Sequence, residues 1–205
     1  MKRGKFVVIE GGMGCGKTTQ INLLKKALKR NWKFYREPGG TPYGEKVRDA
    51  VQGLNGYKVE EYASMFGYSA SRANLIRGVI IPLLEKGKNV ILDRYWYSTY
   101  AYQSIGKVSK KDIVLVSKIA TKDLKPDLVI HFDLNPEITM KRKEGKEDID
   151  RYDLKKINFH KKVRINYKEL SKIIGKKWKT IDASRTIEDI HNDTIVILRK
   201  NKIIS

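Results

Sequence analysis

Short apolar runs alternate with longer amphipathic segments along the chain. Residues 6–10 (FVVIE), 89–93 (NVILD) and 127–134 (DLVIHFDL) are rich in Val, Ile and Leu. Runs of this length and composition predict buried strands. Residues 32–42 and 178–183 predict two more short strands, the first of them broken by Pro and Gly residues. The pattern therefore predicts five strands.

Between these strands the apolar residues recur at helical spacing. Helices are predicted over residues 18–30, 43–52, 59–85, 112–121 and 155–174, and a last helix begins near Ile187. Strands that alternate with helices predict a parallel sheet with right-handed crossovers and helices on both faces. We therefore expect residues 1–205 to form one α/β domain around a five-stranded parallel sheet. Ligands of such folds bind at the carboxyl ends of the strands.

Composition limits the class of protein. The 205 residues include 43 Lys and Arg against 23 Asp and Glu, a net charge of +20. The basic residues are mostly Lys and are spread along the chain, which is typical of a solvated surface that attracts anions locally. Cys15 is the only cysteine, so no internal disulfide can form. No apolar run approaches the roughly 18–20 residues of a membrane helix. We expect a cytoplasmic protein with no membrane partner.

A glycine-rich segment between the first strand and the first helix ends in Lys17 and Thr18. Its pattern, Gly11-x4-Gly16-Lys17-Thr18, matches a P-loop. In such a loop, successive backbone N–H groups surround a phosphate, and the helix N-terminus adds a positive dipole end. The Lys reaches the β- and γ-phosphates, and the Thr hydroxyl can bind Mg²⁺. The residues expected to bind a nucleoside triphosphate are Gly11, Gly12, Met13, Gly14, Cys15, Gly16, Lys17, Thr18 and Thr19.

Asp93 and Arg94 stand at the end of the strand 89–93. A carboxylate at this place can hold Mg²⁺ through water. An Arg at a strand's carboxyl end faces the phosphate crevice, where its planar fork suits a phosphate group. A second anion site favours a phosphorylated acceptor, although Arg94 could instead form an ion pair with a helix. GTPases carry an Asp-x-x-Gly motif after this strand, and the sequence here does not have it. The Asn-Lys-x-Asp guanine motif of GTPases does not occur in the sequence either.

Several longer segments carry a family resemblance. They are VIEGGMGCGKTTQ, REPGGTPYGEKVR, SASRANLI, VILDRYWYSTYAYQ, DRYD and FHKKVRINYKEL. Their order and spacing resemble those of the thymidylate kinases. The resemblance implies a P-loop NTPase fold and transfer of the γ-phosphoryl group of ATP to dTMP, giving dTDP and ADP, with Mg²⁺. It also implies a homodimer.

The resemblance assigns the acceptor site to matched positions of this chain. Arg72 and Arg94 would grip the dTMP phosphate with Arg48 nearby, and Glu37 would lie against the acceptor. Tyr68 stands where the family usually has a Phe that stacks on thymine.

The remaining acceptor contacts concern the base edge and the sugar. Arg72 and Gln103 would read the base edge, and the deoxyribose would be lined by Ser98, Thr99 and Tyr102. Tyr68 could alternatively be an aromatic side chain of the core.

The charged segment over about 141–153 corresponds to the lid of the family. Family members supply a catalytic Arg from the P-loop or from the lid, and this P-loop contains none. The resemblance therefore implies that Arg151 is the catalytic cation, with Arg142 and Lys143 as helpers or contacts on the adenine side. A solvated charged loop is the alternative interpretation.

Met13 is the main departure from the family, which usually has Asp or Glu at this position. A thioether accepts only weak hydrogen bonds and cannot fix water near Mg²⁺. Three hypotheses follow: a slower thymidylate kinase, an enzyme with another acceptor such as dUMP, or a homologue that binds without turnover. The intact set of phosphate-binding residues favours the first.

The high net charge also allows a different class, a basic P-loop ATPase that binds nucleic acid. Nucleic-acid modules usually carry a recognisable arrangement of basic and aromatic residues on one element. The aromatic residues here are not interleaved with Arg in such a module. We therefore do not expect a nucleic-acid partner.

Overall fold

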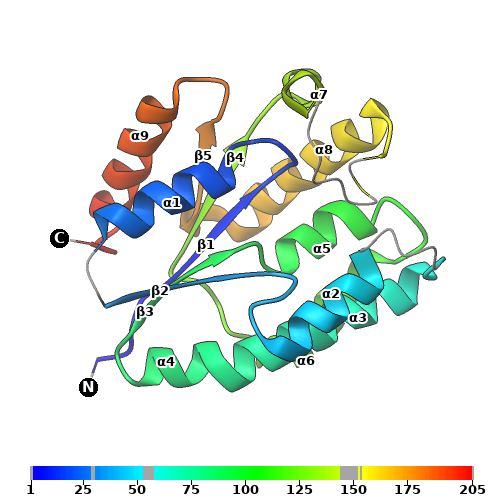
Figure 1. Ribbon diagram of the computed structural model, residues 1–205, viewed down its shortest axis with the longest axis horizontal. Coiled ribbons are helices and arrows are strands. Elements are labelled where there is room, and N and C mark those ends of the chain that lie inside the picture. Colours follow the sequence, from blue (N-terminus) through cyan, green and yellow to red (C-terminus); the bar gives the residue numbers. More distant parts are fainter. Residues whose placement is uncertain (1, 29–30, 53–57, 144–151, 153, 205) are drawn as a thin grey trace.

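One parallel β-sheet organises the fold (Figure 1). The computed structural model describes residues 2–28, 31–52, 58–143, 152 and 154–204. The strands lie in the order β2-β3-β1-β4-β5. They are β1 (Phe6–Gly11), β2 (Trp32–Arg36), β3 (Asn89–Asp93), β4 (Leu128–Asp133) and β5 (Trp178–Asp182). The predicted α/β fold with a five-stranded parallel sheet is confirmed.

Helices cover both faces of this sheet. They are α1 (Lys17–Ala27), α2 (Pro42–Gln52), α3 (Glu61–Leu75), α4 (Ile81–Glu85), α5 (Trp96–Gln103), α6 (Lys110–Thr121), α7 (Pro136–Lys143), α8 (Ile157–Ile174) and α9 (Ile187–Lys200). Figure 1 shows α1 and α9 on one side of the sheet and α3, α4 and α6 on the other. Within the described residues, no helix has the length and apolar character needed to cross a bilayer.

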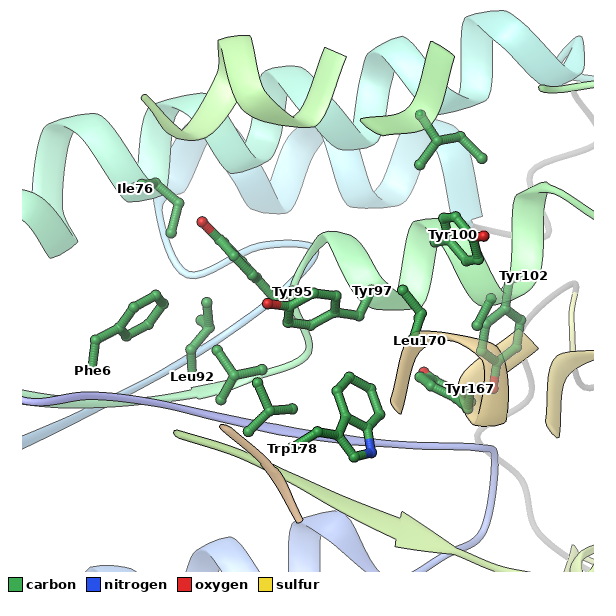
Figure 2. Close-up of a cluster of buried hydrophobic side chains, with 14 of the residues drawn as sticks. Phe6, Ile76, Leu92, Tyr95, Tyr97, Tyr100, Tyr102, Tyr167, Leu170 and Trp178 are labelled. Carbon is green, nitrogen blue, oxygen red and sulfur yellow. The ribbon is translucent and has the colours of Figure 1, made fainter. Parts of the chain in front are cut away.

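Two apolar cores flank the sheet because successive strand residues point to opposite faces. Val7 and Ile9 of β1 belong to the core beneath α1 and α9. Phe6 and Val8 belong to the other core, which is rich in aromatic residues. Figure 2 shows this second core, where Tyr95 and Tyr97 approach side chains of the sheet and Tyr102 approaches Tyr167 of α8.

The predicted helix over residues 59–85 is interrupted. A π-helical turn (Ile76–Ile80) separates α3 from α4, and Pro82 stands at the start of α4. Proline has no N–H to donate, and its ring collides with the carbonyl four residues earlier in a regular α-helix. The wider turn accommodates Pro82 without ending the helical path.

Two helices lie where the sequence predicted none. Helix α5 has aromatic residues around most of its surface, and helix α7 extends to Lys143, into the segment expected to be a loop from residue 141. A 3₁₀ turn (Gly175–Lys177) also follows α8. The first turn of α7 is capped by Asn135, whose Oδ1 accepts a hydrogen bond from the backbone N–H of Glu137 at 3.0 Å.

His131 on β4 makes stability depend on pH. Its ring is 2% exposed and packs 4.7 Å from the ring of Tyr167 and 5.4 Å from that of Trp178, centroid to centroid. Burial lowers the pKa of His131 to about 4. An unfolded His takes up its proton near pH 6.5, so the unfolded chain binds more protons between these two values. Stability contributed by neutral His131 is therefore lost as the pH falls below 6.5.

We expect the free energy of unfolding to fall by about 2 kcal/mol between pH 7 and pH 5 because of His131 alone. Urea unfolding at both pH values measures this change. His131→Phe retains a ring in the core and should remove that part of the pH dependence. Equal losses in the wild type and the variant would contradict the assignment.

Candidate active site

The glycine-rich segment forms a tight loop between β1 and α1. Gly11 has φ +154°, and a Cβ at this position would lie 2.6 Å from Cys15 Sγ and 2.7 Å from the carbonyl oxygen of Phe132. Gly14 and Gly16 have φ of +64° and +88°, in the left-handed region that favours glycine. The loop conformation therefore depends on glycine at three positions. It directs the N-terminus of α1 toward the ligand side of the sheet.

Lys17 folds back over this loop. Its Nζ donates to the carbonyl oxygens of Gly11 and Gly12 at 3.0 and 2.9 Å. Two carbonyl groups therefore hold the ammonium group over the loop, where a phosphate can reach it. Thr18 and Thr19 follow at the exposed start of α1.

Asp93 ends β3, next to β1 in the sheet. One of its carboxylate oxygens, Oδ1, is buried and has no hydrogen-bond partner among the described residues. A carboxylate at the end of a strand beside a P-loop, together with the Thr18 hydroxyl, supplies the hard oxygen donors that Mg²⁺ prefers. These residues fit a magnesium ion.

Arg94 adopts a left-handed backbone conformation, with φ +67°. Its Nη1 donates to Ser98 Oγ at 2.9 Å and to the carbonyl oxygen of Gly11 at 3.2 Å. The guanidinium group lies over the Tyr102 ring, 5.6 Å from its centroid. Within the described part of the chain it forms no ion pair, in contrast to the helix ion pair considered from the sequence.

A cavity beside the loop collects the predicted acceptor residues. Its walls are formed by Met13, Glu37, Pro38, Gln52, Tyr68, Arg72, Arg94, Tyr95, Ser98, Thr99, Tyr102, Gln103 and Tyr152. Of the residues predicted for the acceptor, only Arg48 does not line it. Arg48 instead contacts a residue of the wall: its Nη1 donates to the carbonyl oxygen of Pro38 at 3.2 Å. The sequence did not predict Pro38, Gln52, Tyr95 and Tyr152.

A buried ion pair crosses one side of the cavity. Arg72 Nε donates to Glu37 Oε2 at 2.5 Å, and Arg72 Nη2 donates to Thr99 Oγ1 at 3.1 Å. Arg72 Nη1 and Glu37 Oε1 have no hydrogen-bond partner among the described residues. Burial raises the pKa of Glu37 to about 7, although the Arg72 charge opposes this change. The pair therefore retains one donor and one acceptor for a ligand.

Part of the cavity wall is formed by an aromatic and an amide side chain. Tyr68 on α3 is buried and contributes to the wall. Gln103 Nε2 donates to Ser64 Oγ at 3.3 Å, whereas its buried Oε1 has no partner in the described part. An aromatic face with a nearby amide suits a flat heterocycle that offers polar edges.

Glu10 is the main site residue that the sequence did not single out. Its carboxylate is fully buried and accepts hydrogen bonds from Tyr95 N at 2.7 Å, Ser98 Oγ at 2.8 Å and Tyr167 Oη at 2.9 Å. Burial raises the pKa of Glu10, and the neighbouring Arg94 charge and these hydrogen bonds oppose that rise. The sequence feature that could have identified Glu10 is a carboxylate that ends an otherwise apolar strand.

The predicted lid is described only at its two ends. Arg151 lies outside the described residues, as does the side chain of Arg142. Tyr152 lines the cavity, and its ring centroid is 5.3 Å from that of Tyr102. At the base of the segment, Arg164 of α8 forms two hydrogen bonds to Asp133, of 2.7 and 2.8 Å.

A second ion pair, between α7 and α8, lies near this base. Lys161 Nζ of α8 lies 3.2 Å from Glu137 Oε1 of α7. Together with the Asp133–Arg164 pair it links the end of β4 and the first turn of α7 to α8. We call these four residues the base clamp.

Comparison with known proteins gives a consistent result. A sequence model described as thymidylate kinase matches residues 9–194. The thymidylate kinase of Thermoanaerobacter sp. (strain X514) is 40% identical over 202 residues, covering 97% of this chain and 98% of the relative. The thymidylate kinase of Carboxydothermus hydrogenoformans is 39% identical over 195 residues, with coverage of 92% and 93%. That of Pseudoalteromonas translucida is 37% identical over 199 residues and covers 95% of each chain.

Proposed function

The chain belongs to the thymidylate kinase family, and we propose that it transfers the γ-phosphoryl group of ATP to dTMP, giving dTDP and ADP. The observation that carries this proposal is the juxtaposition of a P-loop with a cavity that contains two Arg side chains. Arg94 and Arg72 supply positive charge to the cavity, and Tyr68 and Gln103 contribute an aromatic ring and an amide to its wall. A monophosphate with a flat base fits this distribution of charge and apolar surface.

Phosphoryl transfer depends mainly on positioning and on charge stabilisation. The P-loop amides and Lys17 hold the ATP phosphates, and Arg94 holds the acceptor phosphate beside them. An oxygen of the acceptor phosphate attacks the γ-phosphorus, the new P–O bond forms as the bond to the β-phosphate oxygen breaks, and ADP leaves. Thr18 and Asp93 would hold Mg²⁺, which neutralises charge on the phosphate oxygens when bound.

An acceptor panel tests the proposal. ADP release is measured with ATP, Mg²⁺ and one of dTMP, dUMP, UMP, CMP or AMP, and without an acceptor. We expect the rate with dTMP to exceed every other rate. A preference for another monophosphate would retain the kinase fold and reassign Tyr68 and Gln103 as altered specificity residues. No release with any acceptor, in protein that still binds ATP, would refute the proposed activity.

Met13 lines the acceptor cavity at the P-loop, where the thioether offers no strong hydrogen-bond acceptor. We expect Met13→Asp to raise kcat with dTMP by about tenfold, the lower end of the range for one hydrogen bond to a charged group. Steady-state rates at saturating ATP measure the change. Met13→Asn is the matched control, because Asn has the shape of Asp without its charge. An unchanged rate in Met13→Asp would mean that Glu37 or water already fills this role.

We also propose that the chain acts as a homodimer and that residues 1–205 are one kinase domain. Phe66 on α3 is 54% exposed, and Leu115 and Ile119 on α6 are 58% and 63% exposed. Helices α3 and α6 pack together, and Tyr62, one turn before Phe66, donates to Asp112 on α6 at 2.8 Å. Exposed apolar side chains therefore stand on two helices that pack together, a distribution that suits burial against a second copy of the chain. Light scattering that gives the mass of a single 23.7 kDa chain would refute the dimer.

A further inference from the structure

We propose that Glu10 is a positioning residue for the acceptor phosphate. Its buried carboxylate fixes the backbone turn and the hydroxyl group that aim Arg94 into the cavity. This inference rests on the proposed function, in which Arg94 binds the phosphate of dTMP. Glu10 itself does not line the cavity, but it contacts Tyr95 and Ser98, which do.

One oxygen of Glu10 holds the turn that follows β3. Tyr95 N donates to Glu10 Oε1 at 2.7 Å, and Arg94 N donates to the carbonyl oxygen of Ile9 at 2.9 Å. Arg94 lies between these two bonds with φ +67°. A left-handed conformation costs a non-glycine residue about 1 kcal/mol or more, so it persists only where its surroundings hold it. The strand end that begins the P-loop provides that support.

The other oxygen of Glu10 orients the Arg94 side chain through Ser98. Ser98 Oγ donates its proton to Glu10 Oε2 at 2.8 Å, which leaves its lone pair free to accept from Arg94 Nη1 at 2.9 Å. Tyr167 on α8 donates to the same Oε2 at 2.9 Å. The Ser98 and Tyr167 hydroxyl oxygens also lie 3.0 Å apart, so Glu10, Ser98 and Tyr167 form one hydrogen-bonded cluster that fixes the position of Ser98 Oγ.

Both oxygens of Glu10 accept hydrogen bonds, and the Arg94 charge favours its ionised form. Burial acts in the opposite direction and raises the pKa of Glu10. The charged groups that act on this site are Arg94, which is attractive, and Glu37, whose own pKa the Glu10 charge raises. Tyr167 faces it from α8. Burying a carboxylate costs desolvation free energy that an apolar side chain does not. A residue that only filled the space at the strand end would therefore be more stable as an apolar one.

Glu10→Gln tests the inference, because it preserves the shape of the side chain and replaces one accepting oxygen with a donating amide. Calorimetry measures the Kd of dTMP and of thymidine, which lacks the phosphate. We expect the Kd of dTMP to rise roughly 10- to 100-fold, the range for a hydrogen bond to a charged group. The Kd of thymidine should change less than about twofold. In an Arg94→Ala background, Glu10→Gln should have little further effect.

A structural role predicts a different result. Equal weakening of dTMP and thymidine, or additive effects of Glu10→Gln and Arg94→Ala, would overturn the inference. If Glu10→Gln does not fold, Tyr167→Phe replaces it, because this variant keeps the ring and removes one donor to the carboxylate. An unchanged ratio of the two Kd values in Tyr167→Phe would then overturn it. Wild-type protein that binds dTMP no better than thymidine would instead refute the proposed function.

Discussion

Arg94→Ala is expected to lower kcat/KM for dTMP by on the order of 10³-fold, because it removes the cation that the fold holds in the cavity. Losing one partner of a desolvated charge pair costs roughly 2–5 kcal/mol, and each 1.4 kcal/mol is a factor of ten. The Arg94 guanidinium is held by Ser98 and by a P-loop carbonyl. These neutral groups leave its charge available for the acceptor phosphate.

Steady-state kinetics with varied dTMP measures this loss. Arg94→Lys should recover part of the activity, since it restores the charge without the planar fork. Arg185→Ala is the matched control, because Arg185 is an exposed residue before α9 that pairs with Asp193. A loss below tenfold in Arg94→Ala would mean that Arg72 alone holds the phosphate.

Arg151→Ala is expected to lower kcat by on the order of 10³-fold with little change in the Kd of dTMP. An Arg that closes on the transferring phosphoryl group stabilises charge that develops only in the transition state. Arg151 lies outside the described residues, but its neighbour Tyr152 lines the cavity. The P-loop offers Gly14 and Cys15 in place of an Arg.

Single-turnover kinetics and dTMP binding together test Arg151. Lys17 remains in this variant, so the binding of ATP should be retained. Arg36→Ala is a suitable control, because Arg36 is an exposed residue at the end of β2 that pairs with Glu45. An effect below tenfold would assign the catalytic cation to another residue of the 141–153 segment, and Arg142 would be tested next.

The sequence predicted the parts of the fold that rest on local patterns. Buried parallel strands are continuous apolar runs, so β1, β3 and β4 were clear. The P-loop was equally clear because its backbone requires glycine at fixed places. The acceptor residues came from longer motifs, and the structure brings all but Arg48 to one cavity. Their roles as ligands stay predictions.

Helix α5 escaped prediction because both of its faces are covered. One face carries Thr99, Tyr102 and Gln103 to the cavity, and the opposite face packs Tyr97 and Tyr100 into the aromatic core. Most of this helix is buried, so it lacks the polar stripe from which an amphipathic helix is recognised.

Glu10 was missed for a related reason. The role of a carboxylate at the end of an apolar strand depends on partners far away in sequence. Tyr95, Ser98 and Tyr167 are 85, 88 and 157 residues from Glu10 along the chain. No local window includes them. Buried polar networks of this kind become visible only after the fold has assembled their members.

The base clamp has a consequence for how the segment between α7 and α8 can vary. Asp133 with Arg164 and Glu137 with Lys161 hold the end of β4 and the first turn of α7, which lead into this segment, against α8. The entropy cost of closing such a loop grows slowly, by about 0.6 kcal/mol for each doubling of its length. Insertions or deletions between the clamped ends should therefore cost the fold little. The segment can change in length and composition as an exchangeable module while the sheet, the P-loop and the acceptor cavity stay the same.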